Sequence, residues 1–217
     1  RVRIGLVADT HLPSLMRSLD ELGPEVGNFL STVELILHAG DVTAPLVLDW
    51  LEQYAPVLVS QGNNDLFEDR RMKLVQLLDI EGWRIGMTHE LRPESRPIAE
   101  MVATRLHGEP VDILIGGDTH VDRLEYREDT VLINPGSPNL PHHKETRLGT
   151  VALLELARGR LRAEIIVLGH SDGSPNPGVS RHLEIVDGQL VGASLNGDPV
   201  QPQGFGSAAP VQDAPRV

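Results

Sequence analysis

The first half of the chain alternates short apolar runs with segments of helical pattern, and this order limits the folds it can adopt. Residues 2–7, 34–37 and 56–60 have the length and the apolar content of buried strands. Residues 24–31 and 44–54 lie between these runs and have the pattern of helices. A strand–helix–strand–helix–strand order predicts parallel strands joined by right-handed crossovers, and hence an α/β fold.

The rest of the chain is predicted to be richer in strands. Residues 72–80 and 83–88 are separated by a glycine-containing turn, which predicts a hairpin. A helix is predicted at 96–107, because apolar residues recur on one face of that segment. Another apolar strand is expected at 111–115, followed by successive antiparallel strands at 123–127, 131–133, 149–156 and 161–167.

We expect one domain with an appendage. A chain of 217 residues with 40% hydrophobic residues is long enough for one core of ordinary size. The core domain is predicted to span residues 1–168. Residues 169–217 are predicted to form a C-terminal extension, with a Ser-, Gly- and Pro-containing linker, a β-hairpin at 182–194 and a Gly/Pro-rich tail.

The charge balance and the lack of cysteine exclude several functions. Thirty-one acidic residues against 19 basic ones give a formal net charge of −12, which argues against strong nucleic-acid binding. Without cysteine, this chain has no disulfides, zinc–thiolate sites or cysteine nucleophiles. No signal-peptide pattern is visible and no apolar run approaches the ~20 residues that span a bilayer. We therefore expect a cytoplasmic protein with no membrane partner.

Polar side chains follow directly after each predicted buried strand. In open α/β sheets, ligands bind at the carboxyl ends of the strands, so these side chains should meet at one edge. Asp9 and His11 lie two residues apart, and in extended backbone they would point to the same side. The full set comprises Asp9, His11, Asp41, Asn63, His89, Asp118 and His120.

This set of oxygen and nitrogen ligands without sulfur indicates a metal site. Carboxylate plus imidazole suits Mn²⁺, Fe²⁺ or Zn²⁺. Seven candidates exceed the three or four protein ligands of one open site, and they fit two ions roughly 3.5–4 Å apart that share a carboxylate. Singly, each residue has an ordinary alternative: Asp9 as a helix cap, Asn63 as a turn residue, His89 on the surface. Together these alternatives require the same coincidence at five strand ends.

The order of these motifs resembles a known signature. The chain contains DTH at 9–11, GD at 40–41, GNND at 62–65, a histidine at 89 and GDTH at 117–120. This resembles the calcineurin-like metallophosphoesterase superfamily, whose signature runs D-x-H, G-D, G-N-x-D/E, H and G-H-x-H. The INPGS stretch at 133–137 resembles an element of its small bacterial and archaeal phosphodiesterase branch, which also includes the metallophosphoesterase-like subunit of retromer. The resemblance covers about residues 2–168.

The resemblance implies a four-layer α/β/β/α sandwich of two mixed sheets flanked by helices, with a dinuclear metal site. By position, the first ion would be held by Asp9, His11, Asp41 and His120, and the second by Asp41, Asn63, His89 and Asp118. Asp41 would bridge the ions, and a bridging hydroxide would attack phosphorus while Asn63 stabilises the phosphoryl oxygens. The implied function is that of a metal-dependent phosphodiesterase acting on a small phosphate ester. Mn²⁺ is the expected ion, with Fe, Zn, Ni or Mg as alternatives.

The sequence departs from the family pattern at three positions. Asp118 stands where the family usually has histidine, so it either favours a harder ion such as Mn²⁺ or Mg²⁺, or turns away and leaves the second site weak. Asn64 stands where many members have a histidine that protonates the leaving group. An amide is no general acid near neutral pH, so aryl phosphates and diesters with leaving groups of low pKa should be favoured. Glu90 follows His89 in place of the usual H-G-H stretch.

Two functions of other classes stay open from the sequence. One is a non-catalytic scaffold on the same fold with an impaired second metal site, and Asp118 is the feature that favours it. The other is a sugar- or nucleotide-binding α/β protein, which would need a Gly-rich phosphate loop that the chain lacks. A homo-oligomer is compatible with the sequence. His142 and His143, which follow INPGS, are candidates for contact with substrate phosphate or a solvated loop pair.

Overall fold

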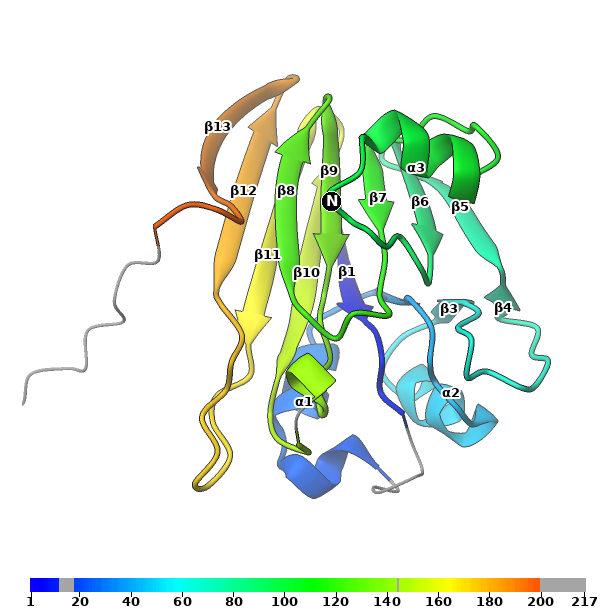
Figure 1. The fold of residues 1–217 in the computed structure, drawn as a ribbon, viewed down its shortest axis with the longest axis vertical. Helices are drawn as coiled ribbons and strands as arrows, with labels where there is room; N and C mark the ends of the chain where they lie inside the picture. Colours follow the sequence, from blue (N-terminus) through cyan, green and yellow to red (C-terminus); the bar gives the residue numbers. More distant parts are fainter. Residues whose placement is uncertain (12–17, 144, 200–217) are drawn as a thin grey trace, which may run out of the picture.

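Two β-sheets pack face to face, with helices on both outer sides (Figure 1). The structure, a computed structural model, describes residues 1–11, 18–143 and 145–199. The large sheet has the order β13-β12-β11-β10-β1-β2-β3-β4, and the small sheet has the order β5-β6-β7-β9-β8. The helices are α1 (Glu25–Leu30), α2 (Pro45–Glu52) and α3 (Ile98–Arg105), with 3-10 turns at Leu19–Leu22 and Pro141–His143.

The strands of the large sheet come from both ends of the chain. They are β1 (Val2–Val7), β2 (Leu35–His38), β3 (Val57–Ser60), β4 (Met72–Lys73), β10 (Thr150–Ala157), β11 (Arg160–Val167), β12 (Arg181–Val186) and β13 (Gln189–Ser194). The small sheet uses the middle of the chain. Its strands are β5 (Val75–Ile80), β6 (Trp83–Thr88), β7 (Ile113–Ile115), β8 (Arg123–Arg127) and β9 (Thr130–Asn134).

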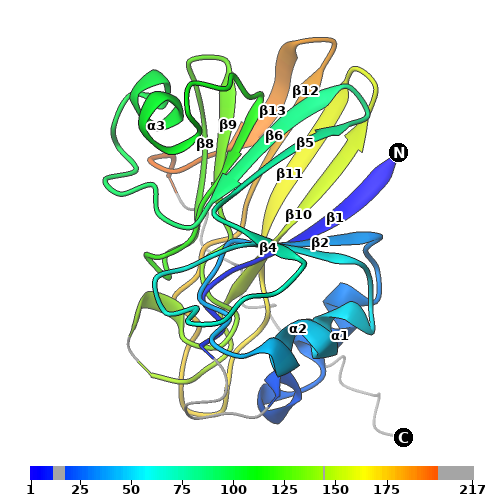
Figure 2. The same cartoon turned by 90° about the vertical axis from the view of Figure 1, so that its right-hand side faces the viewer.

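Three apolar clusters define the layers of the molecule. The largest lies between the sheets and contains Ile4 and Leu6 of β1 with Ile85 and Ile115 from the small sheet. A second cluster joins the outer face of the large sheet to α1 and α2, and a third joins the small sheet to α3 (Figure 2). The predicted four-layer α/β/β/α sandwich is therefore confirmed.

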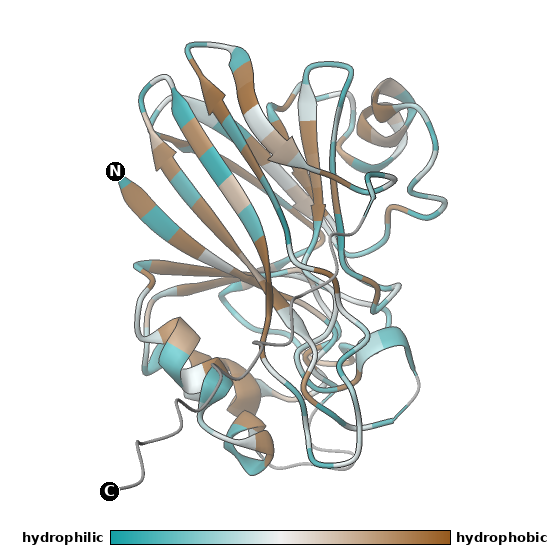
Figure 3. Cartoon of the chain, turned by 90° about the vertical axis from the view of Figure 1, so that its left-hand side faces the viewer, coloured by the Kyte–Doolittle hydropathy of each residue, from teal (hydrophilic) through white to brown (hydrophobic). Residues whose placement is uncertain are grey.

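Alternation along each strand assigns its two faces. In β11, Leu161, Ala163 and Ile165 are buried, and the residues between them are more exposed and polar or charged (Figure 3). In α2, Pro45 begins the helix, and Val47, Leu48 and Leu51 pack against the large sheet.

The predicted parallel pairing of the first three strands is confirmed, since β1 pairs with β2 and β2 with β3, both parallel. The predicted strand at 72–80 is wrong as a single element. It breaks at Leu74, whose side chain is 72% exposed, and β4 joins the large sheet while β5 joins the small one. One segment thus passes from sheet to sheet, which a local apolar pattern does not reveal.

The predicted run of successive antiparallel strands is also wrong. β8 and β9 are antiparallel neighbours, as are β10 and β11, but β9 and β10 belong to different sheets. β9 instead pairs in parallel with β7, and β10 pairs antiparallel with β1. The crossing between the sheets brings Ser137 and Asn139 to the carboxyl end of β1, where they bond to the carbonyls of Asp9 and Thr10.

The C-terminal strands continue the large sheet. β12 pairs with β11, and the β12–β13 hairpin forms its outer edge. Beyond β13, Asn196 donates its N–H to the carbonyl of Leu124 and accepts the Leu124 N–H on its side chain, which ties the hairpin to β8. The predicted tail lies outside the described residues from position 200 onward.

Helices in the described part of the chain are short. α2 and α3 have eight residues each, and no described helix has the length and hydropathy needed to cross a membrane. The cytoplasmic location stays a prediction.

Candidate metal centre

The loops after β1, β2 and β7 place acids and histidines in left-handed backbone. φ is 54° at Asp9, 45° at His11, 58° at Asp41, 70° at Asp118 and 58° at His120. Asp9 and His11 therefore do not reach one point through extended backbone, and that part of the sequence argument is wrong. Left-handed backbone costs energy for residues with a side chain, and such strain concentrates at functional sites.

Two glycines allow these loops to approach one another. At Gly40, where φ is +98°, an added Cβ would lie 2.6 Å from His89 Nδ1 and from the Ser60 carbonyl. At Gly62, it would lie 2.2 Å from Asp41 Oδ1. Any larger residue at either position would push apart the side chains that the loops deliver.

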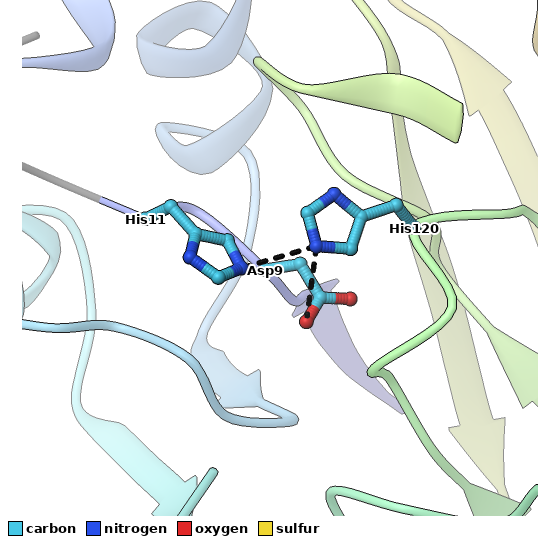
Figure 4. A group of neighbouring side chains, drawn as sticks. All are labelled: Asp9, His11 and His120. Carbon is cyan, nitrogen blue, oxygen red and sulfur yellow. Dashed lines mark hydrogen bonds and ion pairs between the residues drawn. The ribbon is translucent and has the colours of Figure 1, made fainter. Parts of the chain in front are cut away.

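The first group of candidate ligands consists of Asp9, His11 and His120 (Figure 4). His11 Nε2 lies 3.0 Å from His120 Nε2, and His120 Nε2 lies 3.9 Å from Asp9 Oδ1. His11 Nε2 is also 3.3 Å from Asp41 Oδ2, which connects this group to the GD motif. One ligand atom from each member falls within 4.8 Å of the others.

The second group consists of Asp9, Asp41 and His89. His89 Nε2 is 3.5 Å from Asp41 Oδ2, 3.2 Å from Asn63 Oδ1 and 3.6 Å from Asp118 Oδ1. Asp41 Oδ2 thus lies near both His11 and His89. The structure brings all seven sequence-derived candidates into one connected cluster.

Hydrogen bonds to backbone carbonyls set the orientation of two imidazoles. His120 Nδ1 lies 2.8 Å from the Leu140 carbonyl, and His89 Nδ1 lies 2.7 Å from the Ala39 carbonyl. A carbonyl only accepts, so each Nδ1 carries the proton, and Nε2 faces the cluster. A histidine that binds a metal through one ring nitrogen typically donates a hydrogen bond from the other nitrogen in this way.

The two groups differ in charge. Burial lowers the pKa of His11 and lowers that of His120 to about 4, so both rings are neutral at pH 7. Burial also opposes the charge on His89, but its hydrogen bond to Asp41 and the charge of Asp9 outweigh it and raise the pKa of His89 to about 9. Burial disfavours charge on Asp41 as well, yet the hydrogen bond from His89 holds the pKa of that carboxyl well below its usual range.

The residues after the motif asparagine hold Asp41 in place. Asn64 donates its backbone N–H to Asp41 Oδ1 at 3.0 Å and its side-chain amide to Oδ2 at 2.8 Å. The buried Asp65 accepts N–H groups from Asp41, Thr43 and Gly62 at 2.8–3.0 Å. Asn64 therefore positions a candidate ligand, while Asp65 organises the loop that carries it.

Sequence reasoning did not assign a role to three residues in or near INPGS that support the site. Ser137 donates its hydroxyl to the Asp9 carbonyl at 2.8 Å, and Asn139 donates its amide to the Thr10 carbonyl at 2.7 Å. Asn134 donates to the Gly117 carbonyl at 2.9 Å and to Glu94 at 2.8 Å. The INPGS motif was a visible signal, but its targets depend on the crossing between the two sheets.

Two further histidines lie beside the first group. His38 is fully buried; its Nδ1 accepts the Gly40 N–H at 3.1 Å, and its Nε2 lies 3.2 Å from Thr10 Oγ1. His143 is exposed and stacks on the His120 ring with centroids 3.6 Å apart. His142 turns toward Asp122, 3.5 Å away. Of the His142–His143 pair, the second therefore contacts a candidate ligand.

The residues present fit a bound cation. Asp9 is fully buried, and among the described residues its Oδ2 atom has no hydrogen-bond partner. Burial raises the pKa of Asp9 well above its ordinary value, which shows how unfavourable the charge is there without a counter-ion. A divalent cation would satisfy this oxygen, and the surrounding Nε2 and carboxylate atoms form a hard to borderline donor set.

Comparison with known proteins identifies the family. The sequence model of the calcineurin-like phosphoesterase superfamily domain matches residues 2–159. A probable metallophosphoesterase of Methanothermobacter thermautotrophicus is 38% identical over 168 residues, covering 76% of this chain and 92% of that protein. A phosphodiesterase of Methanocaldococcus jannaschii is 27% identical over 154 residues, covering 62% of this chain and 83% of its own length. The chain belongs to the calcineurin-like phosphoesterase superfamily.

The fold is shared with solved structures of Vps29. Wild-type Vps29 from Entamoeba histolytica, crystallised with zinc, superposes with a TM-score of 0.64 at 21% identity, covering 85% of this chain and 99% of that one. At this identity the likeness concerns the fold. The assignment to the superfamily is thus confirmed by the sequence comparisons, and the structural comparison supports the fold.

Proposed function

We propose that this protein is a phosphodiesterase that hydrolyses small phosphate esters with two divalent ions, one in each group. The observation that carries the proposal is the buried Asp9 carboxylate. Its Oδ2 has no hydrogen-bond partner among the described residues, and the carboxylate lies among Nε2 and carboxylate atoms from the loops of His11, Asp41, His89 and His120. The family assignment and the phosphodiesterase relative support the reaction class. A fold without catalytic demand would gain nothing from five candidate ligands in strained backbone.

The proposed ligand sets follow the distances. Asp9, His11, Asp41 and His120 would hold the first ion, and Asp41, Asn63, His89 and Asp118 the second. When bound, two such ions supply a water-derived nucleophile at neutral pH and positive charge for the phosphoryl oxygens. Mn²⁺ is the proposed ion, because carboxylates and an amide oxygen outnumber imidazoles in the second set.

The chain's own side chains would contribute positioning. Asn64 and Asp65 hold Asp41 and its loop, so the shared carboxylate cannot rotate away. The exposed Asn63 faces His89 through Oδ1, and its side-chain amide nitrogen would donate to a phosphoryl oxygen. Asn64 supplies no proton to a leaving group, which favours aryl phosphates and aryl diesters as substrates.

Replacement of Asp41 by asparagine tests the proposal. Manganese-dependent hydrolysis of bis-p-nitrophenyl phosphate should fall more than roughly 100-fold, the upper end for residues that only support a ligand. Asp49→Asn is the control: it makes the same carboxylate-to-amide change in α2, at a side chain that is 63% exposed, and should leave the rate of hydrolysis unchanged. Equal rates in wild type and Asp41→Asn would refute the proposal.

A non-catalytic scaffold is the competing function, and it would use the fold that this chain shares with Vps29. The position of Asp118, which a neighbouring arginine contacts, is the observation in its favour. A scaffold would show no metal-dependent hydrolysis of any member of an aryl and alkyl ester panel. The same panel tests the preference for aryl leaving groups, which equal turnover of alkyl monoesters would contradict.

A further inference from the structure

The loop after β6 turns one cation toward the metal centre. Arg92 forms an ion pair through Nε with Asp118 Oδ2, while Asp118 Oδ1 lies 3.6 Å from His89 Nε2. The guanidinium is therefore separated from the second group by a single carboxylate. The acids of this loop point elsewhere, since Glu90 pairs with Arg105 at 3.0 Å and Glu94 pairs with Arg123 at 3.0 Å.

The guanidinium keeps its binding capacity. The Arg92 side chain is 59% exposed, and its contact with Asp118 is closest at Nε. Because more than half of the side chain is exposed, the guanidinium is accessible to a ligand beside Asp118. A guanidinium in this state matches two oxygens of a phosphoryl group.

The pair also resolves a difficulty with Asp118. A carboxylate where the family pattern has a neutral histidine adds negative charge at the place where an anionic substrate would bind. The charge of Arg92 offsets it, so the Asp118–Arg92 pair is neutral overall. The pair also adds the cationic guanidinium donors of Arg92, whose side chain is largely exposed.

We propose that Arg92 binds the non-bridging phosphoryl oxygens of the substrate and that Asp118 holds it in position. This assignment rests on the proposed phosphodiesterase function. It makes Arg92 a substrate-binding residue and Asp118 the contact between the metal centre and the substrate site. The substrate class follows: esters with an accessible anionic phosphoryl group, approaching from the loop between β6 and α3.

The test compares Arg92→Ala with Arg84→Ala in the manganese-loaded protein. Arg84 is a matched control, because it is 51% exposed, pairs with Asp112 at 3.2 Å, and stands at the opposite end of β6. Arg92→Ala should raise KM for bis-p-nitrophenyl phosphate about tenfold with a smaller change in kcat, and should weaken binding of inorganic phosphate by calorimetry to a similar extent. Arg92→Lys should recover part of the loss. Manganese content should stay at the wild-type value.

Two results would overturn the inference. One is phosphate affinity in Arg92→Ala within twofold of wild type. The other is a gain in manganese content together with faster hydrolysis, which would make Arg92 a competitor of the second ion. Phosphate binding is measured without turnover, so it separates this inference from the proposed function. A wild type that binds phosphate through Arg92 but hydrolyses no ester would refute only the phosphodiesterase.

Discussion

The two halves of the candidate metal centre are supported in different ways. Around the first group, neutral hydrogen bonds hold the loop of Asp9 and His11, with Ser137 and Asn139 bound to its carbonyls. Around the second group, charges do this work: His89 carries a proton shared with Asp41, and Arg92 contacts Asp118. The first group is ready to bind a cation, whereas the second is already balanced by internal cations.

This difference has a consequence for metal binding. A cation entering the first group meets imidazoles that are neutral, because burial lowers the pKa of both His11 and His120. A cation entering the second group must displace the proton of His89. The two ions should therefore bind with unequal affinities and unequal pH dependence.

The largest expected effect is this pH dependence. With the pKa of His89 at about 9, affinity for the second ion should rise by up to about 100-fold between pH 6.5 and 8.5, a factor of ten per unit. The histidines of the first ion should add little to its pH dependence in this range, since their pKa values are lowered. The raised pKa of Asp9, which lies beside the ligand atoms of both groups, affects both ions. Calorimetric titration with Mn²⁺ across this range measures both affinities. If the affinities for the two ions changed equally with pH, the proposed difference in charge between the two groups would be refuted.

The next expected effect is on stability, and it comes from the buried, neutral His38 beside the first group. Burial lowers the pKa of His38 to about 3, against an ordinary value of 6.5. Below pH 6.5 the unfolded chain takes up a proton at this position and the folded chain does not, so His38 costs stability as pH falls. At pH 5 the loss is about 2 kcal/mol, from 1.5 pH units at 1.36 kcal/mol each.

Replacing His38 by glutamine should remove that loss. In ion-free protein, the free energy of unfolding of His38→Gln should fall by about 2 kcal/mol less than that of wild type between pH 7.5 and pH 5. Urea unfolding at the two pH values gives this difference directly. His182→Gln, at an exposed position of β12, is the control. Parallel losses in wild type and His38→Gln would mean that the buried ring is not kept neutral.

Some features of the candidate site could be predicted from the sequence, and others depend on how the two sheets pack. The convergence of Asp9 and Asp41 was predictable, because β1 and β2 are parallel neighbours whose carboxyl ends meet at one edge. His120 follows β7 of the small sheet, so its approach to them depends on the packing of the two sheets, and the prediction of a single sheet edge was wrong. The support from Ser137 was not predictable, because it depends on β9 and β10 lying in different sheets. Strand patterns report which residues are apolar and leave the pairing partner of each strand open.

The contact of Arg92 with Asp118 could not be predicted from the sequence for a related reason. Its loop carries several charges, and nothing in their spacing shows which of them turns toward the centre and which toward α3 and β8. The positive φ at Asp9 and His11 was likewise missed, since few residues other than glycine adopt it and the sequence does not mark which Asp or His will do so. Local sequence thus predicted the candidate ligands, whereas the charges that balance them depend on tertiary contacts.

The smallest expected effect comes from exchanging Asp118 for the family histidine. Asp118→His removes a carboxylate from the ligand set proposed for the second ion and releases Arg92, so the preference of that site for Zn²⁺ over Mn²⁺ should rise roughly tenfold. Competitive titration of the two metals measures the ratio, and Asp172→His, at an exposed position, serves as control.

The same exchange also tests the contact between Asp118 and Arg92. In the Asp118→His background, Arg92→Ala should weaken phosphate binding much less than in wild type, because the guanidinium has already lost its ion pair with Asp118. An unchanged metal preference, with the full effect of Arg92→Ala retained, would show that the two halves of the centre are balanced alike and that Asp118 takes no part in the difference.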